Sequence, residues 1–305
     1  MMWAVHPSPV STKKRTSSAV QCSVVDTRRM CPHCRAFITT KDKVCPYCDT
    51  PVGPRAIDRR DPAPLLGGLI PSARFVTTLI LTVNVGMYLV TALASMKAEL
   101  GGLMNIDGRT LISFGAIWPI AMFQGGEWWR LLTAGALHGG LMHILFNTWA
   151  LMDVGANSEM LYGQKRMASI YILSTIGGFT ASAFWTQSVS VGASAGLFGL
   201  IGAMIALGVI HKTPEAAMIK QVYMRWAIYG LLFGLLPLQI DNAAHIGGLA
   251  TGFLVAWAAG TPKLIDTHPA ERAWSAILVV LLVIVGFCFV KMFGWFKMVS
   301  QMAAL

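Results

Sequence analysis

The stretch G192-A-S-A-G-L-F-G-L-I-G-A203 decides between two fold classes. Its first five residues fit the G-x-S-x-G pattern, which in soluble α/β hydrolases places a nucleophilic serine on a sharp turn between a strand and a helix. The same residues run without a break into an apolar, glycine-rich segment that is typical of a membrane-spanning helix. Ser194 is therefore either a catalytic nucleophile or a small residue at which two membrane helices touch.

The composition of the chain favours a membrane protein. Of its 305 residues, 55% are hydrophobic and only 12% are charged, whereas soluble domains carry about 25% charged residues. Because a membrane helix needs about 20 mostly apolar residues, the sequence predicts seven spans. They are 74–96, 131–152, 167–185, 193–210, 225–239, 242–260 and 273–291. A shorter apolar stretch, 111–123, contains Pro119 and is predicted to be a re-entrant or interfacial element.

The basic residues predict how the chain is oriented in the membrane. Residues 1–74 hold 12 of the 24 lysines and arginines, against five acids. With this arm inside, 19 basic residues lie on the inner side and five on the outer side, as the positive-inside rule requires. We therefore expect an integral protein of a bacterial cytoplasmic (inner) membrane, with its amino terminus in the cytoplasm and its carboxyl terminus outside. The basic arm suggests contact with membrane lipid, and no nucleic-acid partner is expected.

Five polar residues on three predicted spans fall at a similar depth near the outer face. They are His138, His143 and Asn147 in the second span, Ser194 in the fourth and His245 in the sixth. Ionisable residues inside membrane spans are rare and usually functional, because burying them in hydrocarbon is costly. A serine hydroxyl becomes a good nucleophile when a neighbouring base accepts its proton, and histidine is the usual base near neutral pH.

Of the three histidines, His245 is the best candidate for that base. Gly248 and Gly252 follow it at helical spacing and form a stripe that lets a neighbouring backbone come close. The serine helix offers a matching row, Ala195, Gly199, Gly202 and Ala206. Since no acid lies at this depth and Asp241 is expected to cap the sixth span, the sequence predicts a Ser–His dyad rather than a triad.

The oxyanion of a tetrahedral intermediate needs preorganised donors. His143 and Asn147 share one helical face and, with the Ser194 backbone N–H, could supply them. Structural interpretations compete with these roles. Ser194 can be a packing residue, His138 and Asn147 can bridge helices, and Trp128, Trp129 and Arg130 can form an interfacial anchor.

At these residues the sequence resembles the rhomboid family of intramembrane serine proteases. The resemblance rests on W129-R130, H138-G-G-L-M-H-I-L-F-N147, G192-A-S-A-G196 and A244-H-I-G-G-L-A-T-G252, and it covers about 70–260. It implies Ser194 as nucleophile, His245 as general base, and His143, Asn147 and the Ser194 N–H as the oxyanion site. It also implies supporting roles for His138, for Trp129 and Arg130 in the first loop, and for Gly248 and Gly252. The implied substrates are single-span membrane proteins cut near the outer face. The alternative is a non-proteolytic protein of the same fold that binds transmembrane clients.

The amino-terminal arm contains two Cys-Pro-x-Cys knuckles separated by ten residues. Their four thiols can close a tetrahedral site around structural Zn²⁺, and the ligands are Cys31, Cys34, Cys45 and Cys48. Iron in the same site and a redox function are the alternatives. Cys22 and Cys288 have no assigned role. The zinc ribbon could dock a cytoplasmic partner, and catalysis itself is expected to need no cofactor.

The expected fold is an all-α polytopic membrane protein with a small zinc ribbon before it. The predicted domains are a disordered basic arm (1–28), the ribbon (29–50), a linker (51–72), a six-helix rhomboid core (73–262) and an extra carboxyl-terminal transmembrane helix (263–305).

Overall fold

The computed structural model describes residues 28–31, 33–39, 42–52, 75–236, 240–259 and 268–302, which form two compact units divided between Ala63 and Pro64. Most of the predicted basic arm, most of the linker, Cys22, and residues 260–267 around the predicted start of the extra helix lie outside these residues.

The smaller unit contains a hairpin of two short strands. Strand β1 (Arg28–Met30) pairs antiparallel with β2 (Phe37–Thr39), with Arg28 opposite Thr39. Its few buried side chains include Ile38, Val52 and two of the cysteines. So small a core buries little apolar surface, which is why such units usually need a metal or disulfides.

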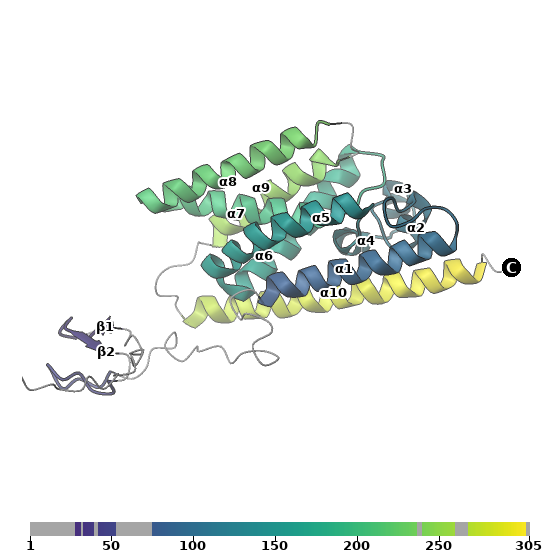
Figure 1. Ribbon diagram of the computed structural model, residues 1–305. Coiled ribbons are helices and arrows are strands. Elements are labelled where there is room, and N and C mark those ends of the chain that lie inside the picture. Colours follow the sequence, from purple (N-terminus) through teal and green to yellow (C-terminus); the bar gives the residue numbers. More distant parts are fainter. Residues whose placement is uncertain are drawn as a thin grey trace, which may run out of the picture. The chain divides into compact units, whose positions relative to one another are not determined.

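The larger unit is a bundle of helices, as the composition predicts (Figure 1). Its long helices are α1 (Phe75–Lys97), α5 (Leu141–Ala150), α6 (Ala156–Trp185), α7 (Ser194–Ile210), α8 (Pro214–Phe233), α9 (Asn242–Ala259) and α10 (His268–Met302). The short helices α2 (Gly108–Ser113), α3 (Pro119–Phe123) and α4 (Arg130–Thr133) gather at the end of the bundle where α10 finishes (Figure 1).

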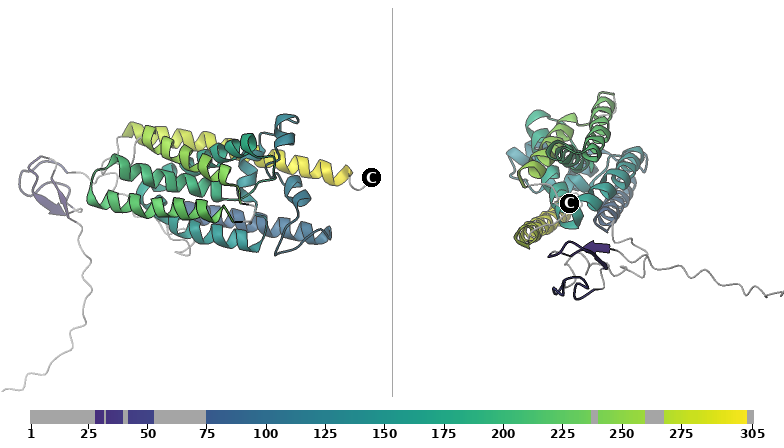
Figure 2. Two further views of the ribbon diagram at one scale, coloured as in Figure 1. Left: turned by 90° about the horizontal axis from the view of Figure 1, so that it is seen from above. Right: turned by 90° about the vertical axis from the view of Figure 1, so that its left-hand side faces the viewer.

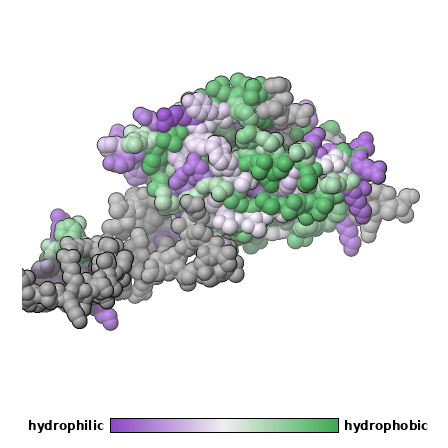
Figure 3. Space-filling view, in the orientation of Figure 1, coloured by the Kyte–Doolittle hydropathy of each residue, from purple (hydrophilic) through white to green (hydrophobic). Residues whose placement is uncertain are grey.

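The described helices include three that are long and apolar enough to cross a membrane, Phe75–Lys97, Leu141–Trp185 and Ala270–Lys297, and α7 is a shorter apolar helix. Leu141–Trp185 comprises α5, a π-helical turn (η4, Leu151–Gly155) and α6, and its backbone breaks at Gly163 (φ 75°). It therefore supplies two antiparallel segments. On the visible face, apolar side chains cover much of the middle and hydrophilic ones collect near both ends (Figure 3).

The second predicted span, 131–152, is wrong at both ends. Residues 130–136 form α4 and a 3₁₀ turn (η3, Ala134–Ala136), and α5 begins only at Leu141. The interruption has a physical cause, because Leu137 is extended and the Gly139 carbonyl accepts a hydrogen bond from the Ile106 N–H (2.9 Å). The helix then continues beyond residue 152 to the break at Gly163. A run of uncharged residues does not reveal such an interruption.

Other boundaries differ less. The predicted fifth span, 225–239, corresponds to α8, which begins eleven residues earlier because Thr213 caps it and Pro214 is its first residue. The third span, 167–185, is the second part of α6, and the seventh, 273–291, lies within the longer α10. The stretch 111–123 is divided between α2 and α3, and Pro119 is the first residue of α3.

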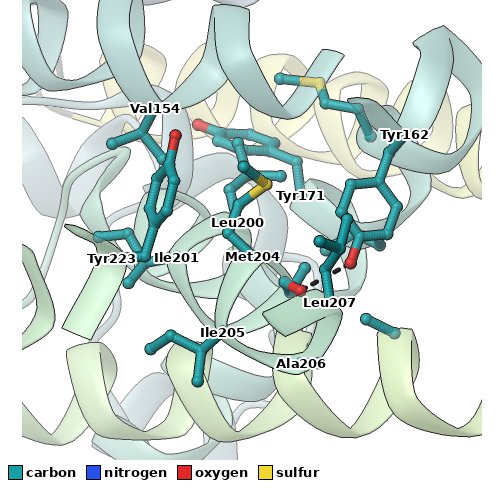
Figure 4. Close-up of a cluster of buried hydrophobic side chains, with 14 of the residues drawn as sticks. Val154, Tyr162, Tyr171, Leu200, Ile201, Met204, Ile205, Ala206, Leu207 and Tyr223 are labelled. Carbon is teal, nitrogen blue, oxygen red and sulfur yellow. Dashed lines mark hydrogen bonds between the residues drawn. The ribbon is translucent and has the colours of Figure 1, made fainter. Parts of the chain in front are cut away.

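Helix α7 lies at the centre of the bundle and contacts α6, α8 and α9 (Figure 2). Its side chains are buried from Ala195 to Leu207. Leu200, Met204 and their neighbours pack against Tyr162, Tyr171 and Tyr223 from the surrounding helices (Figure 4). The Tyr162 hydroxyl donates to the Ala203 carbonyl (2.6 Å), so this polar group is satisfied inside the core.

Candidate functional site

Ser194 is the first residue of α7 and is only partly buried. Gly192, two residues earlier, has φ +131°, a conformation that residues with a side chain rarely adopt. A Cβ atom on Gly192 would lie 2.7 Å from His143 Nε2 and 3.5 Å from Ser194 Oγ, so both atoms border the same point. A glycine is needed at position 192 for two reasons: its backbone has a positive φ, and a side chain would clash with His143.

The second glycine of the stretch, Gly196, faces a different neighbour. A Cβ there would lie 2.5 Å from the Tyr171 ring, because α6 packs closely on this turn of α7. Together the two glycines let the start of α7 fit between α6 and the segment that carries His143.

The serine and histidine helices touch backbone to backbone. A Cβ on Gly248 would lie 2.1 Å from the Ala195 carbonyl oxygen, and one on Gly252 would lie 1.9 Å from that of Gly199. Gly202 of α7 meets the Leu249 carbonyl in the same way, at 2.1 Å. The close approach of α7 and α9 that the glycine spacing predicts is confirmed. It brings the first turn of α7 beside the turn of α9 that follows His245.

His245 is buried on α9, with 6% of its surface exposed. Its ring stacks on Phe198 of α7, with ring centres 4.1 Å apart and an interplanar angle of 11°. Phe198 is four residues after Ser194 and so lies on the same face of α7. Phe198 is not among the residues predicted from the sequence, although its i+4 spacing from Ser194 is a signal for it.

Asp241 caps α9, as predicted. Its carboxylate accepts hydrogen bonds from the Ala244 N–H (3.0 Å) and from the Ser182 hydroxyl. His245 Nδ1, which is buried, has no hydrogen-bond partner within the described part of the chain. The acid nearest to His245 in sequence is therefore engaged elsewhere.

His143 and Asn147 lie on the first two turns of α5. The Gly139 N–H donates to His143 Nδ1 (3.4 Å), which places the hydrogen of a neutral imidazole on Nε2, the atom beside Gly192. The buried Asn147 amide donates to the His143 carbonyl (3.1 Å). His138 precedes α5, is fully buried, and has its ring centre 5.1 Å from that of His143.

The first loop (residues 98–129, which includes α2 and α3) is fastened beside this site by Arg130. The guanidinium donates to the carbonyls of Ile112 (2.7 Å) and Ala116 (2.9 Å), and its Nε donates to Glu127 (2.6 Å). Arg130 is fully buried and also lies over the Trp129 ring at 4.7 Å. The interpretation of Trp129-Arg130 as a surface anchor is thus wrong for Arg130.

The first loop also joins the segment that leads into α7. Ile117 and Ser190 exchange two backbone hydrogen bonds, of 2.9 and 3.2 Å. The Gly192 N–H donates to the Ala134 carbonyl (3.0 Å). Ser194 is therefore positioned both by α9 and by the first loop.

Comparison with known proteins identifies the family of this chain. The family profile described as "Rhomboid domain" matches residues 125–262. Rhomboid-like protease 1 of Toxoplasma gondii is 30% identical over 210 residues, which are 66% of this chain and 69% of that protein. The chain belongs to the rhomboid family.

Two further relatives match this rhomboid over only part of their length. Rhomboid protease GluP of Bacillus subtilis is 39% identical over 189 residues, which are 62% of this chain but 36% of that protein. RHOMBOID-like protein 6, mitochondrial, of Arabidopsis thaliana is 40% identical over 152 residues, 48% of each chain. This rhomboid thus spans half or less of the length of several curated relatives that it matches.

A candidate metal centre lies in the smaller unit of this rhomboid. The Sγ atoms of Cys31, Cys34, Cys45 and Cys48 lie within 4.8 Å of one another. The Cys31–Cys48 and Cys34–Cys45 sulfur distances are 3.7 and 3.6 Å. A tetrahedral Zn²⁺ with Zn–S bonds of about 2.3 Å needs sulfurs about 3.8 Å apart, whereas a disulfide needs about 2.05 Å. The four thiols therefore fit a metal ion.

Both cysteine knuckles have the same backbone geometry. In each, the first cysteine N–H donates to the carbonyl five residues later, Ala36 (2.8 Å) or Thr50 (2.9 Å). The residue after the second cysteine has a positive φ, 61° at Arg35 and 52° at Asp49. This repetition orients all four thiols toward a common point without a long core behind them.

Proposed function

We propose that this rhomboid is an intramembrane serine endopeptidase in which Ser194 is the nucleophile and His245 the general base. The observation that carries the proposal is the contact of α7 with α9 beside Gly248, which puts the serine turn next to the histidine turn. The stack of Phe198 on His245 supports it, because it holds the imidazole on the face of α7 that carries Ser194.

The proposed reaction has two steps. Ser194 Oγ attacks the carbonyl carbon of the substrate peptide bond while His245 accepts the hydroxyl proton, and the same imidazolium then protonates the leaving amine. In the second step His245 takes a proton from water as the water oxygen attacks the ester carbonyl carbon, and the imidazolium then returns a proton to Ser194 Oγ as the C–O bond breaks and the acid product leaves. Because Asp241 is engaged with Ala244 and Ser182, the pair acts as a dyad.

The oxyanion of both steps would be bound by His143, Asn147 and the Ser194 backbone N–H. The hydrogen bond from Gly139 supports this role of His143, because it leaves Nε2 as a donor beside the serine. Asn147 keeps one amide hydrogen free for the oxyanion after its bond to the His143 carbonyl. His138, packed against His143, would fix that ring, and Trp129 with Arg130 would fix the first loop.

The proposed substrates are single-span membrane proteins, cleaved near the outer face of a bacterial cytoplasmic membrane. The start of α1 and the start of α7 lie at opposite ends of the bundle (Figure 2). If the basic arm is cytoplasmic, as the charge distribution predicts, Ser194 therefore lies near the outer surface, where water reaches it.

Cleavage by the reconstituted full chain tests this function. Wild type is expected to cut a labelled single-span substrate in liposomes, and Ser194→Ala is expected to be inactive. Ser188→Ala is the matched control, because Ser188 is an exposed serine in the same segment, six residues earlier. Equal cleavage by Ser194→Ala would refute the assignment. Binding without cleavage across a varied panel would favour the non-proteolytic alternative, a protein that holds transmembrane clients.

We also propose that Cys31, Cys34, Cys45 and Cys48 hold one structural Zn²⁺. The sulfur distances and the repeated knuckle geometry support it. Four thiolates leave no coordination position for water, so the ion would stabilise the fold rather than catalyse. Elemental analysis of the purified protein should find about one zinc per chain. Cys45→Ser should lose it and Cys288→Ser should keep it. One iron per chain in place of zinc, or no metal, would contradict the proposal.

A further inference from the structure

A groove runs between the first loop and α10, at the end of the bundle where α10 finishes. It has a volume of about 990 Å³. Its apolar wall includes Leu132 of α4, Ile176 of α6, and Ile284 and Phe287 of α10. The charged residues of its lining are Glu127 and Lys291. We call it the α10 groove, and no step of the proposed reaction uses it.

The charges on α10 place this groove relative to the bilayer. Between Arg272 and Lys291 the helix carries no charged residue, so its uncharged segment, 273–290, is about 27 Å long. This length is close to the thickness of about 30 Å of the hydrocarbon core. Lys291 therefore lies at the membrane interface, and Ile284 lies about 10 Å deeper, among the acyl chains. The groove extends from the headgroup region into the hydrocarbon.

The mouth of the groove carries a net positive charge. Lys291 is exposed, and its ammonium lies 5.7 Å from the centre of the Phe287 ring. Glu127 also lines the groove, but its carboxylate is paired with the buried Arg130 at 2.6 Å. These three charges sum to one positive charge beside an apolar channel. Trp128, which is 46% exposed, adds the kind of amphipathic ring that is enriched at membrane interfaces.

We propose that the α10 groove binds one anionic phospholipid. Its phosphate lies beside Lys291, and one acyl chain lies along Leu132, Ile176 and Ile284. The single cation selects a lipid with net negative charge, and the apolar wall requires an attached chain, so free phosphate is not a ligand. This binding does not depend on proteolysis, and failure of either proposal leaves the other standing.

Native mass spectrometry of the full chain in detergent tests the charge. The probes are phosphatidylglycerol and phosphatidylcholine with the same dioleoyl chains. Wild type should retain one phosphatidylglycerol in preference to phosphatidylcholine. Lys291→Ala should weaken phosphatidylglycerol retention about fivefold, the effect of one cation near a membrane surface. Lys97→Ala removes an exposed lysine at the last residue of α1 and should leave retention unchanged. Wild-type retention in Lys291→Ala, or an equal loss in Lys97→Ala, would overturn the proposal.

A second variant tests the groove itself without changing the charge. In Ile284→Trp the larger side chain occupies space in the groove and should lower retention of the dioleoyl lipid. Glycerol phosphate, which has no acyl chain, should stay unbound in wild type and in every variant. A photo-reactive benzophenone amino acid at position 284 should form an adduct with the mass of phosphatidylglycerol in mixed liposomes. Unchanged retention in Ile284→Trp would overturn the proposal, as would an adduct only to an added transmembrane peptide.

Discussion

Two junctions position the candidate active site, and they are built differently. Where α7 meets α9, backbone lies on backbone, and there is no space for a Cβ at Gly202, Gly248 or Gly252. Where the first loop meets the bundle and α10, backbone hydrogen bonds such as those of Ile117 with Ser190 are supplemented by large side chains, chiefly Arg130, Trp295 and Phe296. Glycines that lack a side chain set the distance between the helices at the first junction, whereas large side chains add to the backbone hydrogen bonds at the second.

The difference has consequences for how each junction fails. A side-chain atom added at the α7–α9 contact would clash with a carbonyl oxygen that cannot move unless a whole helix moves. We therefore expect almost every substitution of these glycines to disrupt the junction. The first loop is held by several separate contacts, so removing one of them should increase its mobility only in part. We infer that the distance between Ser194 and His245 is nearly fixed, whereas the first loop becomes more mobile by degrees as its contacts are removed.

The largest expected effect is at Gly252. In Gly252→Leu the first added atom would lie 1.9 Å from the Gly199 carbonyl oxygen, and three more carbons would follow. Excess methylenes in a packed core cost about 1–3 kcal/mol, so this side chain should prevent native packing of the bundle. Thermal unfolding in detergent measures the loss. Gly286→Leu is the control, because nothing lies within 4 Å of a Cβ there. Similar unfolding temperatures for the two variants would contradict the account of this junction.

Arg130→Ala should have the next largest effect, confined to the first loop. It leaves Glu127 without its partner and frees the carbonyls of Ile112 and Ala116. Losing one member of a buried ion pair costs about 3–5 kcal/mol. Hydrogen exchange of residues 108–129 should accelerate while α7 and α9 keep their protection. Arg109→Ala, at an exposed arginine in the same loop, should change little. Acceleration spread evenly over α7 and α9 would show that the two junctions are not independent.

Trp295→Ala should loosen the same loop by less. The Trp295 ring lies 5.7 Å from the Arg130 guanidinium, and the next residue, Phe296, packs on Phe114 with ring centres 4.5 Å apart. A cation–π contact contributes about 0.5–2 kcal/mol, so exchange near Arg130 should rise modestly. The control is Phe293→Ala, on the same part of α10 but 59% exposed. An equal response from Phe293→Ala would mean that α10 does not support the loop through Trp295.

The smallest expected effect depends on pH and concerns Asp107, which caps α2. Burial alone would raise its pKa, but hydrogen bonds from Thr110, Ser95 and Arg109 hold the pKa below its usual value. Because the folded pKa is the lower one, this stabilisation is present above the ordinary carboxyl pKa of about 4 and is lost as the pH falls through the folded value. Asp107→Asn should lower stability of α2 by about 0.5 kcal/mol at neutral pH and abolish that acid dependence in hydrogen exchange. Unchanged acid dependence in Asp107→Asn would assign it to another group.

The sequence predicts α1, α7 and α9 to within two residues, because each is a charge-free run bounded by turn residues or caps. It also predicts the glycine contact between α7 and α9, since the spacing of small residues is a local property. The four thiols come together as the matched knuckles indicate.

The failures come from contacts between residues far apart in the sequence. Leu137–Gly140 is uncharged yet non-helical, because its backbone pairs with the loop near Ile106. Arg130 is charged yet fully buried, because two carbonyls of the first loop and the Glu127 carboxylate bind its guanidinium. The charges at 215, 220 and 225 concealed the first half of α8. The loop partners of Leu137–Gly140 and Arg130 cannot be inferred from neighbouring residues, whereas Thr213 and Pro214 were a local signal for the start of α8.

Labelling of Ser194 by a serine-reactive fluorophosphonate tests the central claim most directly. The full chain in detergent is treated with the probe, and the modified residue is identified by peptide mass spectrometry. We predict one adduct, on Ser194, with labelling that is at least about 100-fold slower in His245→Ala, since general-base catalysis contributes about 10²–10⁴-fold. Ser188→Ala should label as wild type does. Labelling of Ser194 at the same rate in His245→Ala, or of another serine in its place, would contradict the account.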